Sequence, residues 1–350
     1  MKLIRPSYEI IEQGPGLQGI YDMIEKCGKT SYKSEPKGGD VAKRFVEARV
    51  KEGHGAVLEF GTVYLTFSPG DPTISLRGSG DDETKSYMES RGENIEYFEW
   101  SKTIDFYRKN AYSKVTLSDH KWYVTTNYRV LAENDRLDDL KYLCEPTEYH
   151  EKRYAVKFIT DIGVGREFLR HRTMSMVQES TRYVNYMKDK FGEELTFVIP
   201  SWVPEEKLAT GENICWWDDD WVDMDKIKIV KHAPAELELD PVEVWLNAMY
   251  NSECTYRTLI NAGWVAQQAR GVLPLSTKTE FVMSGFKDSW LHFFCLRSDI
   301  ALAGKPHPQA QELANPLRDE FIERRYITEE ELNERVKLLK DAEEKRGKNL

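Results

Sequence analysis

The sequence predicts an α/β chain of the α+β type, in which helices pack on a mostly antiparallel sheet. Two observations support this fold class. Four short segments either alternate apolar and polar residues or are rich in β-branched and aromatic residues, as strands are. Longer segments between them have apolar residues at the three- and four-residue spacing of helices. The four predicted strands are residues 2–10, 60–67, 151–159 and 194–199.

The first part of the chain predicts a strand, two helices and a second strand. The opening MKLIRPSYEIIEQGPG alternates apolar and polar residues without a long apolar stretch, so it indicates a strand rather than a signal peptide. Apolar residues have helical spacing over residues 17–26 and 41–50, and Gly53 is a suitable stop for the second helix. The segment TVYLTF, residues 62–67, has the composition of a strand.

Residues 68–150 are predicted to form an insertion made mainly of helices. A polar stretch rich in glycine and aspartate is followed by helical patterns at about 94–114 and 129–143. No motif within the insertion points to chemistry. Two roles stay open for the insertion: it could cover an active site or widen the contacts between subunits.

The second half of the chain predicts one strand followed mostly by helices. Residues 151–160 alternate as a strand does, and Thr160 or Asp161 is a suitable N-cap for the next helix. Residues 213–226 combine tryptophans with aspartates, which indicates an exposed excursion. Further helices are expected over residues 241–269 and 289–302 and from Thr328 onward.

The final helix is predicted to be a charged surface helix. It opens with a Thr-Glu-Glu-Glu capping pattern and contains few apolar residues. We therefore expect one domain over residues 1–325, with the insertion inside it, and a charged C-terminal helix over residues 326–350.

Composition and charge exclude several classes of protein. The chain has 350 residues, 40% of them hydrophobic, which is enough to bury a core without a metal or disulfides. Its formal net charge of -10 disfavours a general nucleic-acid binder or a membrane-surface protein, because both need attraction to polyanions. No apolar run approaches the length of a membrane span. The five cysteines are widely spaced without a CxxC pair, so we expect no metal site and a cytoplasmic location.

The densest group of functional side chains is the segment RHRTMSMVQESTRY, residues 170–183. Its arginines offer rigid forks of donors that match phosphate, and its serine and glutamine suit a base or a sugar. The mixture is typical of a site for a nucleotide or a polyphosphate cofactor. The alternative is that the arginines are solvated or paired with the many carboxylates. Apolar neighbours such as Phe168, Met174 and Val177 indicate that the segment is held against a core.

Two further segments carry candidate side chains. Arg270 lies in ARGVLPL, where glycine and proline end the preceding helix, and taken alone it is a cation in the last turn of that helix. In HFFCLR, His292 shares a helix face with Cys295. A histidine on an apolar helix is more often a core residue than a ligand.

These motifs together resemble those of flavin-dependent thymidylate synthases. RHRTMSMVQES has that family's signature of arginine, histidine, arginine, seven residues and serine, and STRY continues it. GHGAVLEF at 53–60, ARGVLPL at 269–275 and HFFCLR at 292–297 occur in the family's order. The resemblance covers about half of the chain, and compact members lack a segment as long as residues 68–150.

The resemblance implies a role for each matched residue. FAD would be bound by His54, Arg170, His171, Arg172 and His292. The nucleotide would be held by Glu167, Gln178, Ser180, Arg182 and Arg270. Arg297 would be the catalytic residue that polarises the pyrimidine carbonyls.

The implied reaction is the reductive methylation of dUMP to dTMP. The resemblance implies 5,10-methylenetetrahydrofolate as the carbon donor, NADPH as the reductant, and a homotetramer with FAD at subunit interfaces. Hydride from reduced flavin makes a cysteine nucleophile unnecessary, but it requires fixed donors for the charge that develops on the uracil oxygens.

Departures from the family pattern keep alternatives open. Ala56 stands where a hydroxyl residue is common, Asp288 where a basic residue is common, and residues 300–306 shift the register of His307. An enzyme that hydroxymethylates deoxyuridylate on the same scaffold is one alternative. A nucleotide-binding relative without catalysis is another, whereas nucleic-acid binding through the arginines is disfavoured by the net charge.

Overall fold

The computed structural model describes residues 1–68, 95–188, 191–204, 240–301 and 304–347. The excursion predicted at residues 213–226 lies outside these ranges, as does the first part of the predicted insertion. Across the described ranges, no helix combines the length and the apolar character needed to cross a membrane.

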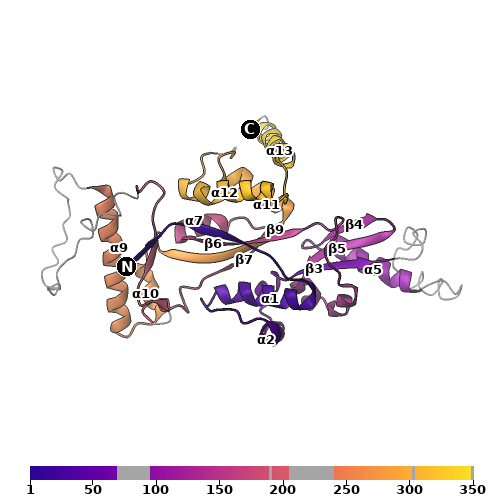
Figure 1. Ribbon diagram of the computed structural model, residues 1–350, viewed down its shortest axis with the longest axis horizontal. Helices are drawn as coiled ribbons and strands as arrows, with labels where there is room; N and C mark the ends of the chain where they lie inside the picture. The colour runs from indigo at the N-terminus through magenta and orange to yellow at the C-terminus, as the bar shows by residue number, and fades with distance from the viewer. Residues whose placement is uncertain (69–94, 189–190, 205–239, 302–303, 348–350) are drawn as a thin grey trace.

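A four-stranded antiparallel sheet forms the centre of the molecule, in the order β2-β6-β9-β7 (Figure 1). Its strands are β2 (Ser7–Ile11), β6 (Arg153–Asp161), β9 (Lys278–Phe286) and β7 (Ser175–Gln178). β6 and β9 pair over their whole length, from Arg153 opposite Phe286 to Asp161 opposite Lys278. The predicted class of an antiparallel sheet with packed helices is therefore confirmed, although β7 and β9 were not predicted as strands.

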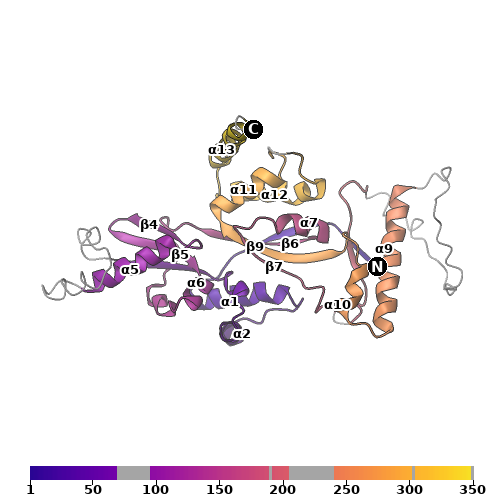
Figure 2. The same cartoon turned by 180° about the vertical axis from the view of Figure 1, so that it is seen from behind.

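Helices cover both faces of this sheet (Figures 1 and 2). One face carries α1 (Gly16–Thr30), against which α2 (Gly39–Lys51) and the short α3 (Gly55–Leu58) pack. The other face carries α7 (Ile162–Phe168), α11 (Lys287–Arg297) and α12 (Pro308–Glu323). The expected helices near 17–26, 41–50 and 162 are confirmed, and Asp161 caps α7 by accepting a hydrogen bond from the Val164 amide at 2.8 Å.

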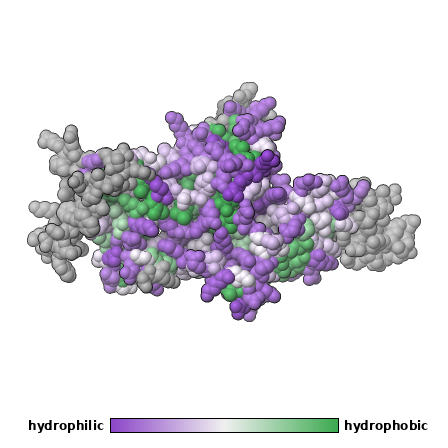
Figure 3. All heavy atoms as spheres, viewed as in Figure 1, coloured by the Kyte–Doolittle hydropathy of each residue, from purple (hydrophilic) through white to green (hydrophobic). Residues whose placement is uncertain are grey.

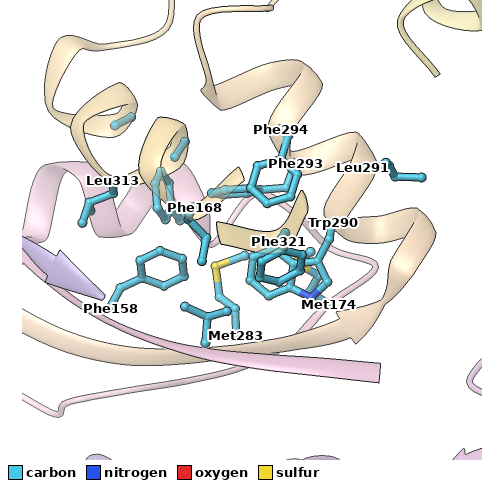
Figure 4. Close-up of a cluster of buried hydrophobic side chains, with 14 of the residues drawn as sticks. Phe158, Phe168, Met174, Met283, Trp290, Leu291, Phe293, Phe294, Leu313 and Phe321 are labelled. Atoms are coloured by element: carbon cyan, nitrogen blue, oxygen red, sulfur yellow. The ribbon is translucent and has the colours of Figure 1, made fainter. Parts of the chain in front are cut away.

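The main core lies between the sheet and the α7, α11 and α12 layer, and aromatic side chains dominate it (Figure 4). Phe158 from β6 contacts Phe168 and Phe293 across the layer, with ring centroids 5.2 and 6.2 Å apart. Full burial of one such side chain contributes roughly 1.5–3 kcal/mol. This core fixes the end of α7 beside α11, where several candidate site residues lie.

A second, three-stranded sheet lies at one end of the molecule, in the order β3-β5-β4 (Figure 1). It consists of β3 (Thr62–Phe67), β5 (Lys121–Asn127) and β4 (Lys114–Ser118), with α5 (Ile95–Lys109) and α6 (Tyr128–Glu133) beside it. One prediction is therefore wrong, because the strand near 60–67 does not join the central sheet. The described part of the insertion contains helices, as expected, and also a β-hairpin that was not predicted. The β4–β5 hairpin turns at Asp119 and His120, whose φ angles of 48° and 58° fit a tight hairpin turn without the glycine that usually signals one.

The predicted strand over residues 2–10 is broken in two. Pro6 has no amide donor and separates β1 (Lys2–Ile4) from β2. β1 pairs in parallel with β8 (Thr196–Val198), so the strand predicted at 194–199 exists but lies outside the central sheet. This pair lies beside α9 (Pro241–Asn261), at the end opposite the three-stranded sheet (Figure 1).

Three predicted helices end earlier than expected. Gly263, with φ of 93°, separates α9 from α10 (Ala266–Ala269), so the helix predicted over 241–269 is two helices. The helix predicted to run to residue 302 ends at Arg297. The helix expected at 129–143 is α6 followed by a 3-10 turn (Leu137–Tyr142), with Asp135 at positive φ between them.

The C-terminal helix α13 (Glu329–Gly347) begins with the predicted capping box. Glu331 donates its amide to Thr328 Oγ1 at 3.1 Å and accepts the Thr328 amide at 3.0 Å. Lys287 binds the same carboxylate at 2.6 Å, and Leu332 is buried in the main core. The charged helix is therefore anchored to α11 rather than only laid on the surface.

Candidate functional site

The end of α11 meets the end of α7 at Arg297. The Arg297 guanidinium donates to the Glu167 carboxylate at 2.7 Å and to the Glu167 carbonyl oxygen at 2.8 Å. Its Nε donates to His171 Nε2 at 3.1 Å. Three predicted site residues are thus brought together, although Arg297 lies more than a hundred positions after Glu167 and His171 in the chain.

His171 is held neutral in this cluster. Its ring is 6% exposed and lies 6.1 Å from the His292 ring. Because Arg297 can only donate, His171 Nε2 must accept, and the ring proton is placed on Nδ1. Burial lowers the pKa of His171 to about 3, with further lowering by Arg297, His292 and Arg170. A role for His171 at a cofactor would therefore be that of a neutral ring.

The other predicted cofactor residues lie in different surroundings. His292 is half-buried, and its Nδ1 has no hydrogen-bond partner among the described residues. Burial lowers the pKa of His292, and Arg335 adds to this. Arg170 is exposed beside the cluster, whereas the side chain of His54 is 63% exposed and contacts Glu52 at 3.5 Å. The structure thus places His292 and Arg170 with His171, and His54 elsewhere.

Three of the predicted nucleotide residues meet at the loop that follows β7. Ser180 donates its amide to the Ser31 carbonyl at 3.1 Å, and its hydroxyl accepts the Arg182 amide at 3.3 Å. Arg270 donates to Thr181 Oγ1 at 3.4 Å. Arg182 and Arg270 are both exposed, so their guanidinium groups are accessible to an anion.

Gln178 lies at the end of β7, under α7. Its Nε2 donates to Thr279 Oγ1 at 3.0 Å. A Cβ atom added at Gly165 would stand 3.3 Å from that nitrogen, so a glycine there allows the close approach. Gln178 therefore lies on the same side of the sheet as Glu167.

A buried charge network, which was not predicted, lies beneath the loop. Glu179, 5% exposed, binds Lys278 at 3.0 Å and accepts the Tyr186 hydroxyl at 3.1 Å. Lys278 also binds Glu280, which pairs with Lys157 at 2.6 Å. Burial raises the pKa of Glu280, but Lys278 and Lys157 outweigh it and hold the pKa at about 2. The bond between Glu179 and Tyr186 closes the loop that carries Ser180 and Arg182.

Arg172 lines a polar cavity of about 290 Å³ together with Arg153. Arg153 donates to the Glu59 carbonyl oxygen at 2.9 Å and to Ser175 Oγ at 3.2 Å. Burial lowers the pKa of Arg153 to about 10, yet no carboxylate lies within ion-pair distance of it among residues whose placement is described. The cavity therefore contains positive charge without a matching anion, which suits a phosphate. The sequence did not single out Arg153.

A larger cavity, of about 480 Å³, lies between α7 and α9. Glu167 lines it together with four residues that were not predicted as site residues: Asp161, Trp202, Trp245 and Gln309. His307 also lines it, at the N-cap of α12, with its ring 5.7 Å from that of Trp202. Figure 3 shows hydrophobic residues exposed on this face near α7.

The cysteines contain one pairing that the sequence analysis did not foresee. Cys144 Sγ lies 3.8 Å from His150 Nε2. The Thr147 amide donates to His150 Nδ1, so the proton is placed on Nε2, which lies 3.2 Å from the Leu65 carbonyl oxygen. The imidazole therefore cannot accept a proton from Cys144, and burial raises the pKa of this thiol.

Within the part of the chain that the structure describes, no three His, Cys, Asp or Glu side chains are grouped to hold a metal ion.

The sequence model of the thymidylate synthase complementing protein family matches residues 147–324. This is half of the chain, and the chain belongs to that family. The matched range contains every predicted site residue except His54. The resemblance drawn from the motifs is confirmed at the level of the family.

Two curated relatives are both flavin-dependent thymidylate synthases. The protein of Thermosipho melanesiensis is 30% identical over 154 residues, which is 44% of this chain and 57% of that protein. The protein of Thermosipho africanus is 27% identical over 158 residues, or 45% and 60% of the two chains. The chain thus spans less than two thirds of the length of these relatives.

Solved structures offer a more distant likeness. A UMP/dUMP methylase from Streptomyces cacaoi, bound with 5-Br dUMP, aligns with a TM-score of 0.37 and 12% identity, over 92% of this chain and 93% of that one. Its complex with 5-Br UMP aligns with a TM-score of 0.37 and 13% identity, over 92% and 91% of the two chains. At this distance the likeness carries no argument about function.

Proposed function

We propose that the protein methylates dUMP to dTMP in a flavin-dependent reaction, with 5,10-methylenetetrahydrofolate as the carbon donor and NADPH as the reductant. Family membership and the two curated relatives support this proposal. The structural observation that carries it is the way in which Arg297 is held. Its guanidinium is fixed by Glu167 and His171 at the end of α11, in a half-buried position.

Arg297 has the geometry of a preorganised donor. A guanidinium carries five N–H groups, and three of them are engaged with Glu167 and His171. The remaining two can donate to a pyrimidine carbonyl oxygen. Because Glu167 and His171 already fix the group, little reorganisation is needed as negative charge develops on that oxygen. Arg297 would therefore stabilise the transition state more than the bound substrate.

The residues around Arg172 fit the diphosphate of FAD. The cavity there has the two guanidinium groups of Arg153 and Arg172, and the first of these is without an ion-pair partner among the described residues. The rest of the cofactor would be bound by Arg170, His171 and His292. His54, which lies apart from them, would contact the cofactor separately. When bound, FAD supplies the hydride that the reaction needs. The neutral His171 would orient the cofactor without adding charge.

Ser180, Arg182 and Arg270 would bind the phosphate of the nucleotide, and Gln178 and Glu167 its sugar and base. The loop of Ser180 hydrogen-bonds to the residue after α1, while Arg297 lies on the opposite side of the sheet. Figures 1 and 2 show α10, which precedes Arg270, on the α1 side and α11 on the other. We therefore infer that one active site combines Arg297 of one chain with the Ser180 loop of another, within a homotetramer.

The two fully buried cysteines are poorly suited to attack the pyrimidine. Cys295, beside Arg297 in sequence, is fully buried, and burial raises the pKa of its thiol to about 11. Cys27 is also fully buried, and burial raises its pKa further. A thiolate is the reactive form of cysteine, so neither residue suits nucleophilic catalysis.

The test begins with an absorbance scan of the purified protein with and without added FAD. dUMP, 5,10-methylenetetrahydrofolate and NADPH are then added, and the molecular mass of the nucleotide product is measured by mass spectrometry. Bound flavin is expected, together with a product in which a methyl group replaces one hydrogen, so that its mass exceeds that of dUMP by CH2. Bound flavin with a hydroxymethyl product would show that the enzyme hydroxymethylates dUMP instead. A protein that takes up no flavin would be a nucleotide-binding relative without catalysis.

A further inference from the structure

The insertion forms one wall of the cavity at Arg172. Ala111 and Tyr112, just after α5, and Asn127, at the end of β5, line this cavity together with Arg172 and Phe286. Sequence alone left the role of the insertion open. The structure places part of the insertion in the same cavity as Arg172, which the family signature assigns to the cofactor.

The cavity carries an excess of positive charge from several elements. Arg153 and Arg172 line it, and Lys114 lies over the Phe286 ring at 5.8 Å. Of the described residues that line it, Glu59 alone bears a carboxylate, and Arg129 binds that group at 2.6 Å. The lining therefore favours an anion with more than one charge, such as a diphosphate.

Arg153 retains donors for such a ligand. Its NH1 donates to the Glu59 carbonyl oxygen and lies 3.5 Å from Thr62 Oγ1, and its NH2 donates to Ser175. These contacts use three of the five N–H groups and hold the guanidinium in place. A fixed, partly free arginine loses little conformational entropy when it binds an anion.

Tyr112 supplies an aromatic surface at the rim. Its side chain is 57% exposed, but its backbone is fixed. Asn110 Oδ1 accepts the Tyr112 amide at 2.9 Å, and Ser113 Oγ is hydrogen-bonded to Thr126 Oγ1 at 2.8 Å. A rigid backbone with an exposed ring is suited to stacking on a planar heterocycle.

We propose that the insertion completes the binding site for the adenosine diphosphate half of FAD, with Arg153 on the diphosphate and Tyr112 stacked on the adenine. This inference rests on the proposed function, in which Arg170, His171 and His292 bind the rest of the cofactor and His171 contacts Arg297. The adenine end then points away from Arg297, and the insertion lies at that end of the cavity. Compact relatives without this insertion would bind the adenine differently.

The first test compares Tyr112→Ala with Tyr112→Phe by titration of the purified protein with FAD, ADP and FMN. Stacking on an aromatic side chain is worth about one factor of ten in affinity. Tyr112→Ala is expected to raise the Kd for FAD and ADP about tenfold, while Tyr112→Phe keeps both. FMN lacks the adenosine, so its Kd stays unchanged. Leu117→Ala, at a 55% exposed position elsewhere in the insertion, is the matched control.

The second test addresses Arg153. Arg153→Lys keeps the charge but loses the fork of donors, so it is expected to weaken ADP binding several-fold, as Arg172→Ala should. Thermal unfolding is measured in parallel, because Arg153 also holds Glu59 and Ser175. Wild-type protein that binds neither FAD nor ADP would overturn the proposed function itself. FAD binding by the wild type with equal affinity in Tyr112→Ala would overturn only the role of the insertion.

Discussion

At the scale of single residues, the proposed reaction is tested most directly at Arg297. Replacing Arg297 by alanine removes the two free N–H groups that would stabilise the uracil oxygens, while the cavity at Arg172 stays intact. We expect FAD to remain bound and kcat to fall by roughly 10²–10³-fold, as for other fixed oxyanion donors. Absorbance and steady-state kinetics measure both. Near-normal turnover would show that Arg297 has no such role.

Arg297→Lys is the matched control for this change. Lysine keeps the positive charge but cannot bind Glu167 and His171 in the fork geometry of a guanidinium. We therefore expect a turnover between those of the wild type and the alanine variant, with flavin content unchanged.

The protonation of His171 offers a second prediction at this scale. Its pKa in the folded protein is about 3, against an ordinary value of 6.5, because of burial and of the cations Arg297 and Arg170 and the nearby His292. The unfolded chain therefore binds a proton that the folded chain does not, and the free energy of unfolding falls as the pH falls from 6.5 toward 3. Above pH 6.5 this contribution is fully present.

His171→Gln removes the titrating group and should flatten that part of the pH dependence, as measured by denaturant unfolding. In Arg297→Ala, NMR titration should show the pKa of His171 moved upward, because a nearby cation and a hydrogen bond to the unprotonated nitrogen are both lost. An unmoved pKa would mean that Arg297 does not contribute to its value.

At the scale of elements, the sequence predicted those features that depend on residues close together in the chain. The capping box at Thr328 and Glu331 and the N-cap at Asp161 were visible because each depends on residues within three positions. β9 was missed because it is buried on both faces and so lacks alternation. Its opening Lys278 and Glu280 look like surface residues, but their partners Glu179 and Lys157 come from distant segments.

The buried network also yields a prediction about the loop that carries Ser180 and Arg182. Tyr186→Phe removes the hydrogen bond that closes the loop on Glu179, at 3.1 Å, and leaves the apolar packing of the ring. We expect the KM for dUMP to rise several-fold, in line with the roughly 1 kcal/mol of one hydrogen bond, while FAD affinity and kcat change little. Steady-state kinetics and flavin titration separate these effects.

Tyr256→Phe is the control for this loop variant. Its ring lies 6.0 Å from that of Tyr186, but Glu179 accepts the hydroxyl of Tyr186 rather than that of Tyr256. Loss of the Tyr256 hydroxyl leaves the hydrogen bond that closes the loop in place, so the KM for dUMP should stay unchanged. Equal effects of the two substitutions would show that Tyr186 acts through packing rather than through Glu179.

At the scale of the whole molecule, the sequence predicted most of the charged residues of the candidate site but not their arrangement. The signature motif placed Arg170, His171 and Arg172 on one short segment, yet their side chains lie in different surroundings. Arg153 and Tyr112 escaped notice because only the three-dimensional fold brings β6 and the insertion to Arg172. The sequence around such a residue contains no pattern that indicates a contact with a distant segment.

The last prediction concerns the assembly. If one active site takes Arg297 from one chain and Arg270 from another, then Arg297→Ala and Arg270→Ala should each be inactive alone but complement each other when co-expressed. With random mixing, about a quarter of the composite sites carry neither substitution, so about a quarter of wild-type turnover should return. Each variant co-expressed with itself is the control, and mass measurement verifies the mixed oligomers. Mixed oligomers without recovered turnover would place each site within a single chain, because only then does every site keep one of the two substitutions.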